Sequence, residues 1–300
     1  MKVLLGGDMD AAEAQVWQRA LAAAMPEATW LDTEAAHLQA NDVQAAVVAN
    51  PPPGSLQGLP NLRLIQSLWA GVDRLLMDPT LPAGVPIARM VDPAMSAAMA
   101  ETALWAVLSL HRGFFVYARQ QRQRLWRQHA QRRADELRVL VLGQGEMGRA
   151  AAARIAQQGY RVQGWRREGP TLAQRLTTAD IVVNLLPLTP ETRGLLDAGF
   201  FSALPACASV VNLGRGAHVV DADLLAALDS GHLGHAVLDV FNTEPLPASH
   251  PYWTHPHVTV LPHAAAATDP RSAAAVAATN LRAARDGAAI AHLVDRRRGY

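Results

Sequence analysis

Short apolar runs alternate with helical patterns in the first ninety residues of the chain. Residues 11–25 have the spacing and composition of a helix. The apolar runs have the length of strands and end at glycines, prolines or turn residues; they are 2–5, 45–49, 64–67 and 87–90. This alternation predicts a small parallel α/β unit.

A second series of apolar runs begins at residue 138. Before it, residues 95–128 are rich in alanine and contain only Gly113 as a helix breaker, which predicts one or two helices. The six runs are RVLVL at 138–142, RVQGW at 161–165, DIVVNLL at 180–186, ASVVNLG at 208–214, HAVLDVF at 235–241 and VTVLPH at 258–263. Helical segments separate most of them, so the series predicts a doubly wound sheet. The tail, residues 269–293, predicts a last helix.

Composition and charge narrow the class of protein. The chain has 300 residues, half of them hydrophobic, and a formal net charge of +1. These values exclude a disordered protein, and the length predicts about two domains. Cys207 is the single cysteine and the first ten residues resemble neither a signal peptide nor a membrane anchor, so we expect a cytoplasmic protein without a membrane partner. The arginine-rich stretch 119–133 is interpreted as a helix surface or a subunit contact rather than a nucleic-acid site, because the whole chain is nearly neutral.

A glycine motif follows the strand predicted at 138–142. It reads Gly143-Gln144-Gly145-Glu146-Met147-Gly148 and leads into a helical segment. In this context the first glycine permits a tight turn, the second admits a pyrophosphate, and the third lets the helix pack on the strand. The helix N-terminus supplies N–H groups to the phosphates. The motif therefore predicts dinucleotide binding.

The residues at the end of the next predicted strand bear on the choice of dinucleotide. NAD enzymes usually carry an acid there for the ribose 2′-hydroxyl. This chain has Arg166 and Arg167 instead, with Glu168 next to them. Guanidinium groups bind a 2′-phosphate, so the sequence predicts NADP(H), with NAD(H) as the weaker alternative. The other interpretation of these arginines is the general arginine bias of the composition.

Three residues that carry useful chemistry lie at or just after predicted strand ends. They are Arg215, Glu244 and His263. Reduction of a 2-keto acid needs a cation for the carboxylate and carbonyl and an acid for the developing alkoxide. Arg215 is the expected cation, His263 the expected acid, and Glu244 a partner that orients the imidazole.

The segments that carry these residues resemble the D-isomer-specific 2-hydroxyacid dehydrogenase family. The matching segments are GQGEMG, LLPLTPETRGLL, VNLGRGAHVVDADLLAAL, LDVFNTEPLPASHPYW and HPHVTVLPHAAA, with WAGVD at 69–73 and AETA at 100–103. Arg166, the WAGVD loop and the short length look most like the NADPH-dependent glyoxylate/hydroxypyruvate reductase branch. The resemblance covers nearly the whole chain.

The resemblance implies roles for individual residues. Arg215 would bind the substrate carboxylate and carbonyl, His263 would be the acid/base and Glu244 its partner. Backbone N–H groups of Ala70 and Gly71 would hold the carboxylate, and Trp69 would narrow the pocket toward two- or three-carbon acids. The full set of expected cofactor contacts is Met99, Gly143, Gly145, Glu146, Met147, Gly148, Arg166, Arg167, Leu186, Pro187, Thr192, Leu213, Gly214, Asp239, His263 and Ala265.

Several of these residues have plainer interpretations. Leu186 and Pro187 also suit a turn that ends a strand. Asp239 could be only a capping residue, and Met99 and Met147 could serve only in packing. Two further roles stay open: Trp253 is either a pocket wall or a core residue, and Arg89 either reaches the pocket or caps a strand.

The resemblance also implies the architecture. A Rossmann-type NADP-binding domain, residues 98–265, would be inserted into a smaller flavodoxin-like substrate domain formed by residues 1–97 and 266–300. The family suggests a homodimer through the nucleotide domains. No metal is expected, because His250, His255, His257 and His263 have irregular spacing.

The predicted function is NADPH-dependent reduction of glyoxylate to glycolate and of hydroxypyruvate to D-glycerate. Two alternatives remain: a dehydrogenase for a bulkier 2-keto acid, and a nucleotide-sensing regulatory protein of the same fold. A formate-type relative is disfavoured, since those enzymes have glutamine where this chain has Glu244.

Overall fold

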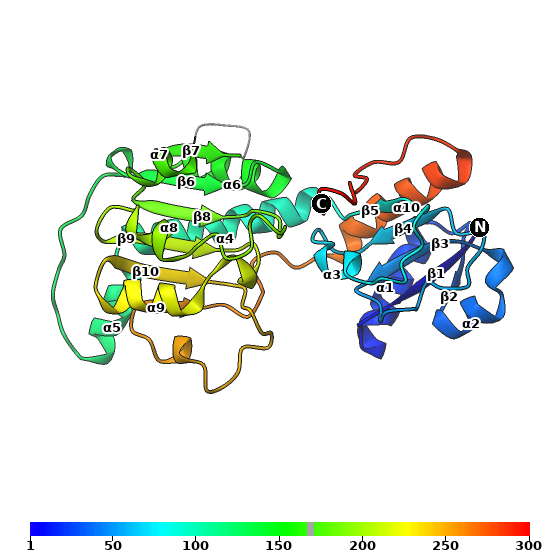
Figure 1. Ribbon diagram of the computed structural model, residues 1–300, viewed down its shortest axis with the longest axis horizontal. Helices are drawn as coiled ribbons and strands as arrows, with labels where there is room; N and C mark the ends of the chain where they lie inside the picture. Colours follow the sequence, from blue (N-terminus) through cyan, green and yellow to red (C-terminus); the bar gives the residue numbers. More distant parts are fainter. Residues whose placement is uncertain (167–170) are drawn as a thin grey trace. The chain divides into compact units, whose positions relative to one another are not determined.

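The structure is a computed structural model and describes residues 1–166 and 171–300. The chain forms two compact units, residues 1–95 with 268–300 and residues 96–267. Each unit has one parallel sheet between helices (Figure 1). The predicted α/β class is therefore confirmed.

The first unit contains a five-stranded sheet. Its strands are β1 (Lys2–Gly7), β2 (Thr29–Leu31), β3 (Val43–Ala49), β4 (Leu64–Ser67) and β5 (Ile87–Ala88). All pair in parallel in the order β2-β1-β3-β4-β5, which is the flavodoxin-like order. β2 was not predicted because it has three residues, of which only Leu31 is buried.

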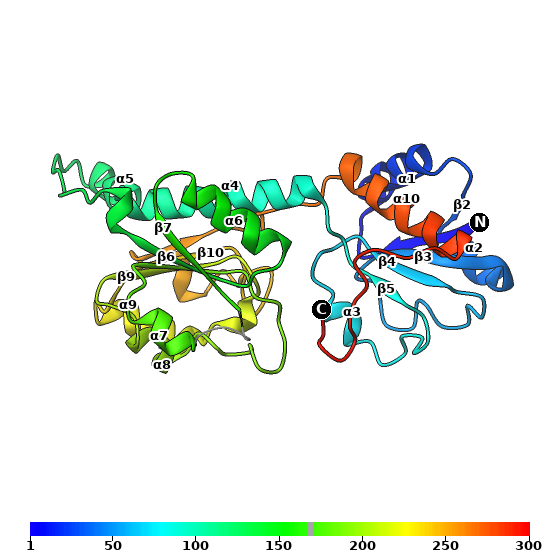
Figure 2. The same cartoon turned by 90° about the horizontal axis from the view of Figure 1, so that it is seen from above.

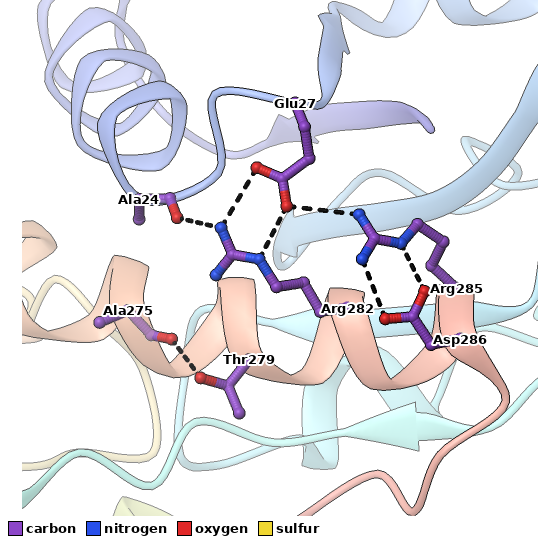
Figure 3. A network of polar contacts seen from close by, with 7 residues as sticks. All are labelled: Ala24, Glu27, Ala275, Thr279, Arg282, Arg285 and Asp286. Carbon is purple, nitrogen blue, oxygen red and sulfur yellow. Dashed lines mark hydrogen bonds and ion pairs between the residues drawn. The ribbon is translucent and has the colours of Figure 1, made fainter.

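Helices cover both faces of this sheet. α1 (Ala11–Ala24) and α10 (Pro270–Asp286) pack together on one face, and the short α2 (Thr33–Leu38) and α3 (Asp73–Leu76) belong to the other (Figure 2). The start of α10 is capped by Asp269, whose carboxylate accepts the N–H of Arg271. The network in Figure 3 joins α10 to the turn after α1, because Glu27 accepts hydrogen bonds from Arg282 and Arg285.

The last helix is shorter than the tail pattern predicted. α10 ends at Asp286 because Gly287 adopts a left-handed conformation with φ +70°. The chain then turns back along β5, where Leu293 forms an antiparallel bridge with Ala88 and the Val294 N–H donates to the Ile87 carbonyl. The prediction of helix to residue 293 was wrong, and the residues after Gly287 instead cover the sheet edge.

The second unit contains the six-stranded sheet that the sequence predicted. Its strands are β6 (Arg138–Leu142), β7 (Arg161–Trp165), β8 (Ile181–Asn184), β9 (Ala208–Asn212), β10 (Leu233–Leu238) and β11 (Val258–Val260). All are parallel, in the order β11-β10-β9-β8-β6-β7. The strand order reverses between β6 and β8, which is where ligands bind in doubly wound sheets.

Alternate side chains of these strands enter two apolar clusters. Leu140 and Val182 face the cluster under α7 (Leu172–Leu176), α8 (Ala198–Ser202) and α9 (Asp221–Asp229), while Val141 and Val183 face α4 (Pro93–His111) and α6 (Glu146–Ala156) (Figure 2). This alternation follows from the pleat of a strand. The four central strands, β6, β8, β9 and β10, are thus buried on both faces.

The alanine-rich stretch before the second sheet forms two helices. α4 is followed by α5 (Phe114–Arg122), and the break is at Gly113, which has φ +70°. The chain is not helical over 125–133, so the predicted helical stretch, which reached residue 128, extends too far. By length and composition α4 would also suit a membrane span. Its buried residues are part of the core of the second unit, which accounts for its apolar character; they include Met99, Ala103, Ala106 and Val107.

Candidate active site

The register of the second sheet brings the predicted site residues to one edge. Leu142, Asn184, Asn212 and Leu238 are aligned across β6, β8, β9 and β10. Trp165 and Val260 extend the same line into β7 and β11. The predicted site segments of this unit begin within three residues after one of these positions, with two exceptions: Glu244 follows β10 by six residues, and Met99 lies on α4.

The glycine motif turns from β6 into α6 as expected. Gly143 has φ +93°, and a Cβ there would lie 2.5 Å from the Leu185 carbonyl oxygen. A Cβ on Gly148 would collide with the carbonyl of Gly143, so both positions need glycine for the packing of the protein itself. Around Gly145, in contrast, no described atom lies within 4 Å of the Cβ position. The missing side chain at Gly145 leaves space beside the start of α6, which suits a pyrophosphate.

Arg166 lies next to this turn. It follows Trp165 at the end of β7, and the Trp165 carbonyl accepts the N–H of Gly143 at 3.0 Å. Its side chain is exposed. Arg167 and Glu168 lie outside the described residues. The described part of the site therefore has a guanidinium, and not an acid, at the place where a ribose 2′-group is recognised.

His263 and Glu244 form a close pair. The Nδ1 atom of His263 lies 2.7 Å from Oε2 of Glu244, while the other oxygen of Glu244 accepts the N–H of Phe241 at 2.9 Å. Because a carboxylate only accepts, Nδ1 carries the proton and Nε2 is left to face another group. About half of the His263 side chain is exposed.

The pair shifts the pKa of both groups. The hydrogen bond that His263 donates to Glu244 raises the pKa of His263 above its usual range, against the opposing effects of burial and of Arg215. Burial favours a higher pKa for Glu244, but its hydrogen bonds with His263 and Phe241 and the charge of Arg215 outweigh burial and lower it. Arg215 is therefore close enough to act electrostatically on both members of the pair. The site combines a fixed cation with an imidazole that stays protonated to higher pH.

Asp239 fixes the backbone of His263. His263 has φ +54°, a conformation that is strained for a residue other than glycine. Its N–H donates to the Asp239 carbonyl, and the two carboxylate oxygens of Asp239 accept the N–H groups of Ala264 and Ala265 at 2.7 and 3.1 Å. These three bonds account for the unusual conformation. Asp239 is buried, and its carboxylate caps these backbone N–H groups, which was the plainer of its two interpretations from the sequence.

Arg215 lies on a loop that packs against the loop of Glu244. The loop continues into the short helix η3 (Gly216–His218). A Cβ on Gly216 would lie 1.9 Å from the carbonyl carbon of Phe241. Only glycine therefore permits the close approach that brings Arg215 beside the Glu244 loop.

Comparison with known proteins agrees with this geometry. The family model of the D-isomer-specific 2-hydroxyacid dehydrogenase NAD-binding domain matches residues 104–265. The chain is 37% identical to glyoxylate/hydroxypyruvate reductase A of Yersinia enterocolitica, over 96% of this chain and 97% of that protein. The chain belongs to the D-isomer-specific 2-hydroxyacid dehydrogenase family.

Solved structures resemble the dehydrogenase over its whole length. A D-isomer-specific 2-hydroxyacid dehydrogenase from Xanthobacter autotrophicus, in complex with NADPH and MES, has a TM-score of 0.94 at 39% identity and covers 100% of this chain and 99% of its own. An NADPH-dependent glyoxylate/hydroxypyruvate reductase from Sinorhizobium meliloti, in complex with NADP and sulfate, has a TM-score of 0.92 at 33% identity, with the same coverage.

The remaining expected cofactor contacts of the dehydrogenase also belong to the second unit. Leu186 is buried after β8, and the hydroxyl of Thr192 donates to the Pro187 carbonyl at 2.8 Å. Leu213 and Gly214 follow β9 and are buried. Met99 and Ala265 are core residues, Met147 is half-buried against the same cluster, and Glu146 forms an ion pair with Arg149. Their contacts with a cofactor stay predictions.

The expected substrate residues Trp69, Ala70 and Gly71 belong to the first unit. They follow β4, where the N–H of Trp69 donates to the Ser67 hydroxyl and its carbonyl accepts the N–H of Met90. The backbone N–H of Arg89 donates to the His292 carbonyl. All three substrate residues are half-buried, and their role in binding stays a prediction.

The other histidines have partners within the protein. His255 approaches Asp229 at 3.2 Å, His257 contacts the Gly234 carbonyl, and His250 lies 3.7 Å from Asp221. Trp253 is half exposed and donates to the Pro247 carbonyl, so the interpretation as a core residue was wrong.

Sequence reasoning missed the residues that hold the backbone of Arg215 and its loop in place. Gly216 was part of a motif but had no assigned role. Asn184, Asn212 and His218 are fully buried and polar. The signal was available in principle, because asparagine at the end of two apolar strands predicts a side chain that must find hydrogen bonds.

Proposed function

We propose that the dehydrogenase reduces glyoxylate to glycolate and hydroxypyruvate to D-glycerate, with NADPH as the hydride donor. The observation that carries this proposal is the His263–Glu244 pair beside Arg215, at the edge that also bears the glycine motif. The names of the Yersinia and Sinorhizobium relatives support the substrate class.

The side chains divide the chemistry between them. Arg215 binds the carboxylate of the keto acid and polarises its carbonyl oxygen. When bound, NADPH supplies the hydride to the carbonyl carbon. His263 donates the proton on Nε2 to the oxygen that becomes the hydroxyl, and Glu244 stabilises the imidazolium before the transfer. In the reverse direction the neutral imidazole takes this proton back.

The preference for NADPH rests on Arg166. Its exposed guanidinium follows β7 directly, where it can pair with a 2′-phosphate. The relatives from Xanthobacter and Sinorhizobium were solved with NADPH and with NADP, which supports the same choice. NAD(H) is the weaker alternative.

The two units have separate roles in this proposal. Residues 98–265 bind NADP(H), and residues 1–97 with 266–300 contribute to substrate binding through Trp69 and the N–H groups of Ala70 and Gly71. The indole of Trp69 favours two- and three-carbon acids over bulkier ones.

We also propose a cytoplasmic homodimer. Large apolar side chains are exposed on and after α4 and α5, which supports a subunit contact; they are Trp105, Phe114, Leu125 and Trp126. Cys207 is a free thiol, in keeping with a reducing compartment.

The test is the oxidation of NADPH with glyoxylate, hydroxypyruvate, pyruvate and a bulky 2-keto acid, each repeated with NADH. We expect fast turnover of the two small acids with NADPH. Arg215→Ala should abolish this turnover while NADPH still binds. Binding of NADPH without turnover of any acid by the unmodified protein would contradict the proposal and favour a nucleotide-sensing regulatory protein.

A further inference from the structure

A fully buried polar network lies directly beneath Arg215. It consists of Asn184 and Asn212, the last residues of β8 and β9, and His218 at the end of η3. Polar side chains are costly to bury, and they remain buried only where hydrogen bonds replace water. The network joins the loop of Arg215 to the loop that contains Pro187.

Backbone groups settle how the two asparagine amides are oriented. The N–H of Leu186 donates to Oδ1 of Asn184 at 3.3 Å, so the amide nitrogen of Asn184 points the other way. The N–H of Gly214 likewise donates to Oδ1 of Asn212 at 3.2 Å. The amide nitrogen of Asn184 therefore donates both to Asn212 Oδ1 at 2.9 Å and to Nδ1 of His218 at 2.8 Å.

The same reasoning settles the tautomer of His218. Its Nδ1 atom accepts the N–H of Arg215 at 3.2 Å as well as the Asn184 amide, so Nδ1 carries no proton. Its Nε2 atom lies 3.3 Å from the Pro187 carbonyl, which can only accept. The imidazole is thus neutral with the proton on Nε2.

Both sides of the Arg215 backbone are held by this network. Its N–H is bound by His218, and its carbonyl accepts the amide nitrogen of Asn212 at 2.9 Å. The peptide groups that orient Arg215 are therefore fixed by side chains at the ends of β9 and η3. An apolar residue of similar size at position 218 would leave the partly buried N–H of Arg215 without this acceptor.

We propose that His218 is a positioning residue for Arg215, acting through the unprotonated Nδ1 atom that accepts the Arg215 N–H. Its effect is on binding of the keto acid carboxylate. The part of this inference that concerns the substrate rests on the proposed function, whereas the part that concerns the Arg215 backbone does not.

Two substitutions distinguish the role of Nδ1 from the role of Nε2 in His218. In His218→Asn the side-chain oxygen takes the place of Nδ1 and still accepts from Arg215, while the contact with Pro187 is lost. In His218→Gln the amide reaches the place of Nε2, and the acceptor for Arg215 is lost. The matched control is His232→Gln, because His232 also contacts a backbone carbonyl, that of Phe201, at a distance from the site.

Three measurements are made on each full-length variant. They are KM and kcat for glyoxylate with NADPH, the dissociation constants of NADPH and of oxalate as a glyoxylate-like dicarboxylate, and hydrogen exchange of the peptide that spans 213–218. We expect His218→Gln to raise KM and the oxalate dissociation constant about tenfold, which is the ratio that about 1.4 kcal/mol produces. The Arg215 amide should exchange faster in this variant, and the NADPH dissociation constant should change less than twofold. His218→Asn and the control should remain within about threefold of the unmodified protein.

Equal losses in His218→Asn and His218→Gln would overturn the inference, because only one of them removes the acceptor. A lower Tm with unchanged KM, oxalate binding and exchange would overturn it as well, since it would indicate a purely structural residue. If the unmodified protein does not turn over glyoxylate, the proposed function fails, but oxalate binding and exchange still decide the role of His218.

Discussion

The imidazole of His263 and the carboxylate of Glu244 are joined by a 2.7 Å hydrogen bond, although the two residues lie on different loops. Glu244 follows β10 and His263 follows β11, and these strands are neighbours in the sheet. The bond raises the pKa of the imidazole and occupies Nδ1, so that Nε2 is the nitrogen left for another partner. Several consequences of this arrangement can be measured.

Replacement of His263 should remove the proton donor without removing the cofactor. We expect His263→Gln to lower kcat about 10²–10⁴-fold, the usual contribution of general acid catalysis. NADPH binding, followed by fluorescence, should change little. His255→Gln is the matched control, since His255 also pairs with an acid, Asp229, outside the site. Parallel losses of turnover and cofactor binding would contradict the assignment.

Replacement of Glu244 should move the pH profile. His263 must be protonated for reduction, and its raised pKa keeps it protonated to higher pH. Glu244→Gln removes the negative charge, so the pH above which reductive kcat/KM falls should shift to lower pH. The measurement is kcat/KM for hydroxypyruvate between about pH 5 and pH 9, which brackets the usual histidine pKa of about 6.5. An unchanged alkaline limb would show that Glu244 does not control this proton.

The same pair makes stability depend on pH with two opposite signs. The raised pKa of His263 contributes stability that is fully present below its unfolded value of 6.5 and is lost as the pH rises through the folded pKa. The lowered pKa of Glu244 contributes stability that is present above its unfolded value of 4.5 and is lost as the pH falls through the folded pKa. In urea unfolding, Glu244→Gln should therefore weaken the dependence of the unfolding free energy on pH in both ranges, the acidic range of Glu244 and the higher range of His263. A variant that keeps the full dependence of the unmodified protein would rule out this contribution.

The close approach of Gly216 to the Glu244 loop should not tolerate a side chain. Gly216→Ala places a Cβ against the backbone of Phe241, so the two loops must separate. We expect a loss of stability of about 1–3 kcal/mol, the usual cost of overpacking, and a large loss of kcat/KM. Thermal unfolding and turnover measure the two effects. Gly84→Ala is the control, because no described atom lies within 4 Å of its Cβ position.

The choice of cofactor should depend on the charge at position 166. Arg166→Ala is expected to weaken NADPH binding while NADH binding stays nearly constant. A charge-assisted hydrogen bond contributes roughly 1.5–3 kcal/mol, which corresponds to about a tenfold to hundredfold change in preference. Arg161→Ala is the control, as Arg161 is an exposed arginine at the opposite end of β7. Equal effects on both cofactors would assign the phosphate contact to another residue.

The sequence predicted the parallel sheet of the second unit well because its four central strands, β6, β8, β9 and β10, are buried on both faces. Their apolar runs are unambiguous, and strand order places Gly143, Arg215 and His263 at one edge. β2 was missed because a three-residue strand with one buried side chain has no periodicity. The end of α10 was misjudged because alanine continues past Gly287, and only the left-handed conformation of that glycine ends the helix.

The supporting contacts could not be predicted, because they depend on register. Asn184 and Asn212 are 28 residues apart and meet only because β8 and β9 are aligned residue for residue. The role of Asp239 depends in the same way on the path of the chain after β11. Sequence patterns show where a polar residue stands in an apolar segment. The atoms that form hydrogen bonds with its side chain are known only from the three-dimensional arrangement.

The return of the chain end along β5 has a consequence for biosynthesis. Residues 1–95 leave the ribosome before the second unit, but their sheet lacks α10 on one face and the 292–294 segment at its edge until residues 270–294 are made. Residues 96–267 are complete earlier and can fold as a body while translation continues at about 5–20 residues per second. Residues 1–95 are therefore made before residues 96–267 but completed after them, and during that interval the β5 edge of their sheet presents unpaired backbone groups to other chains.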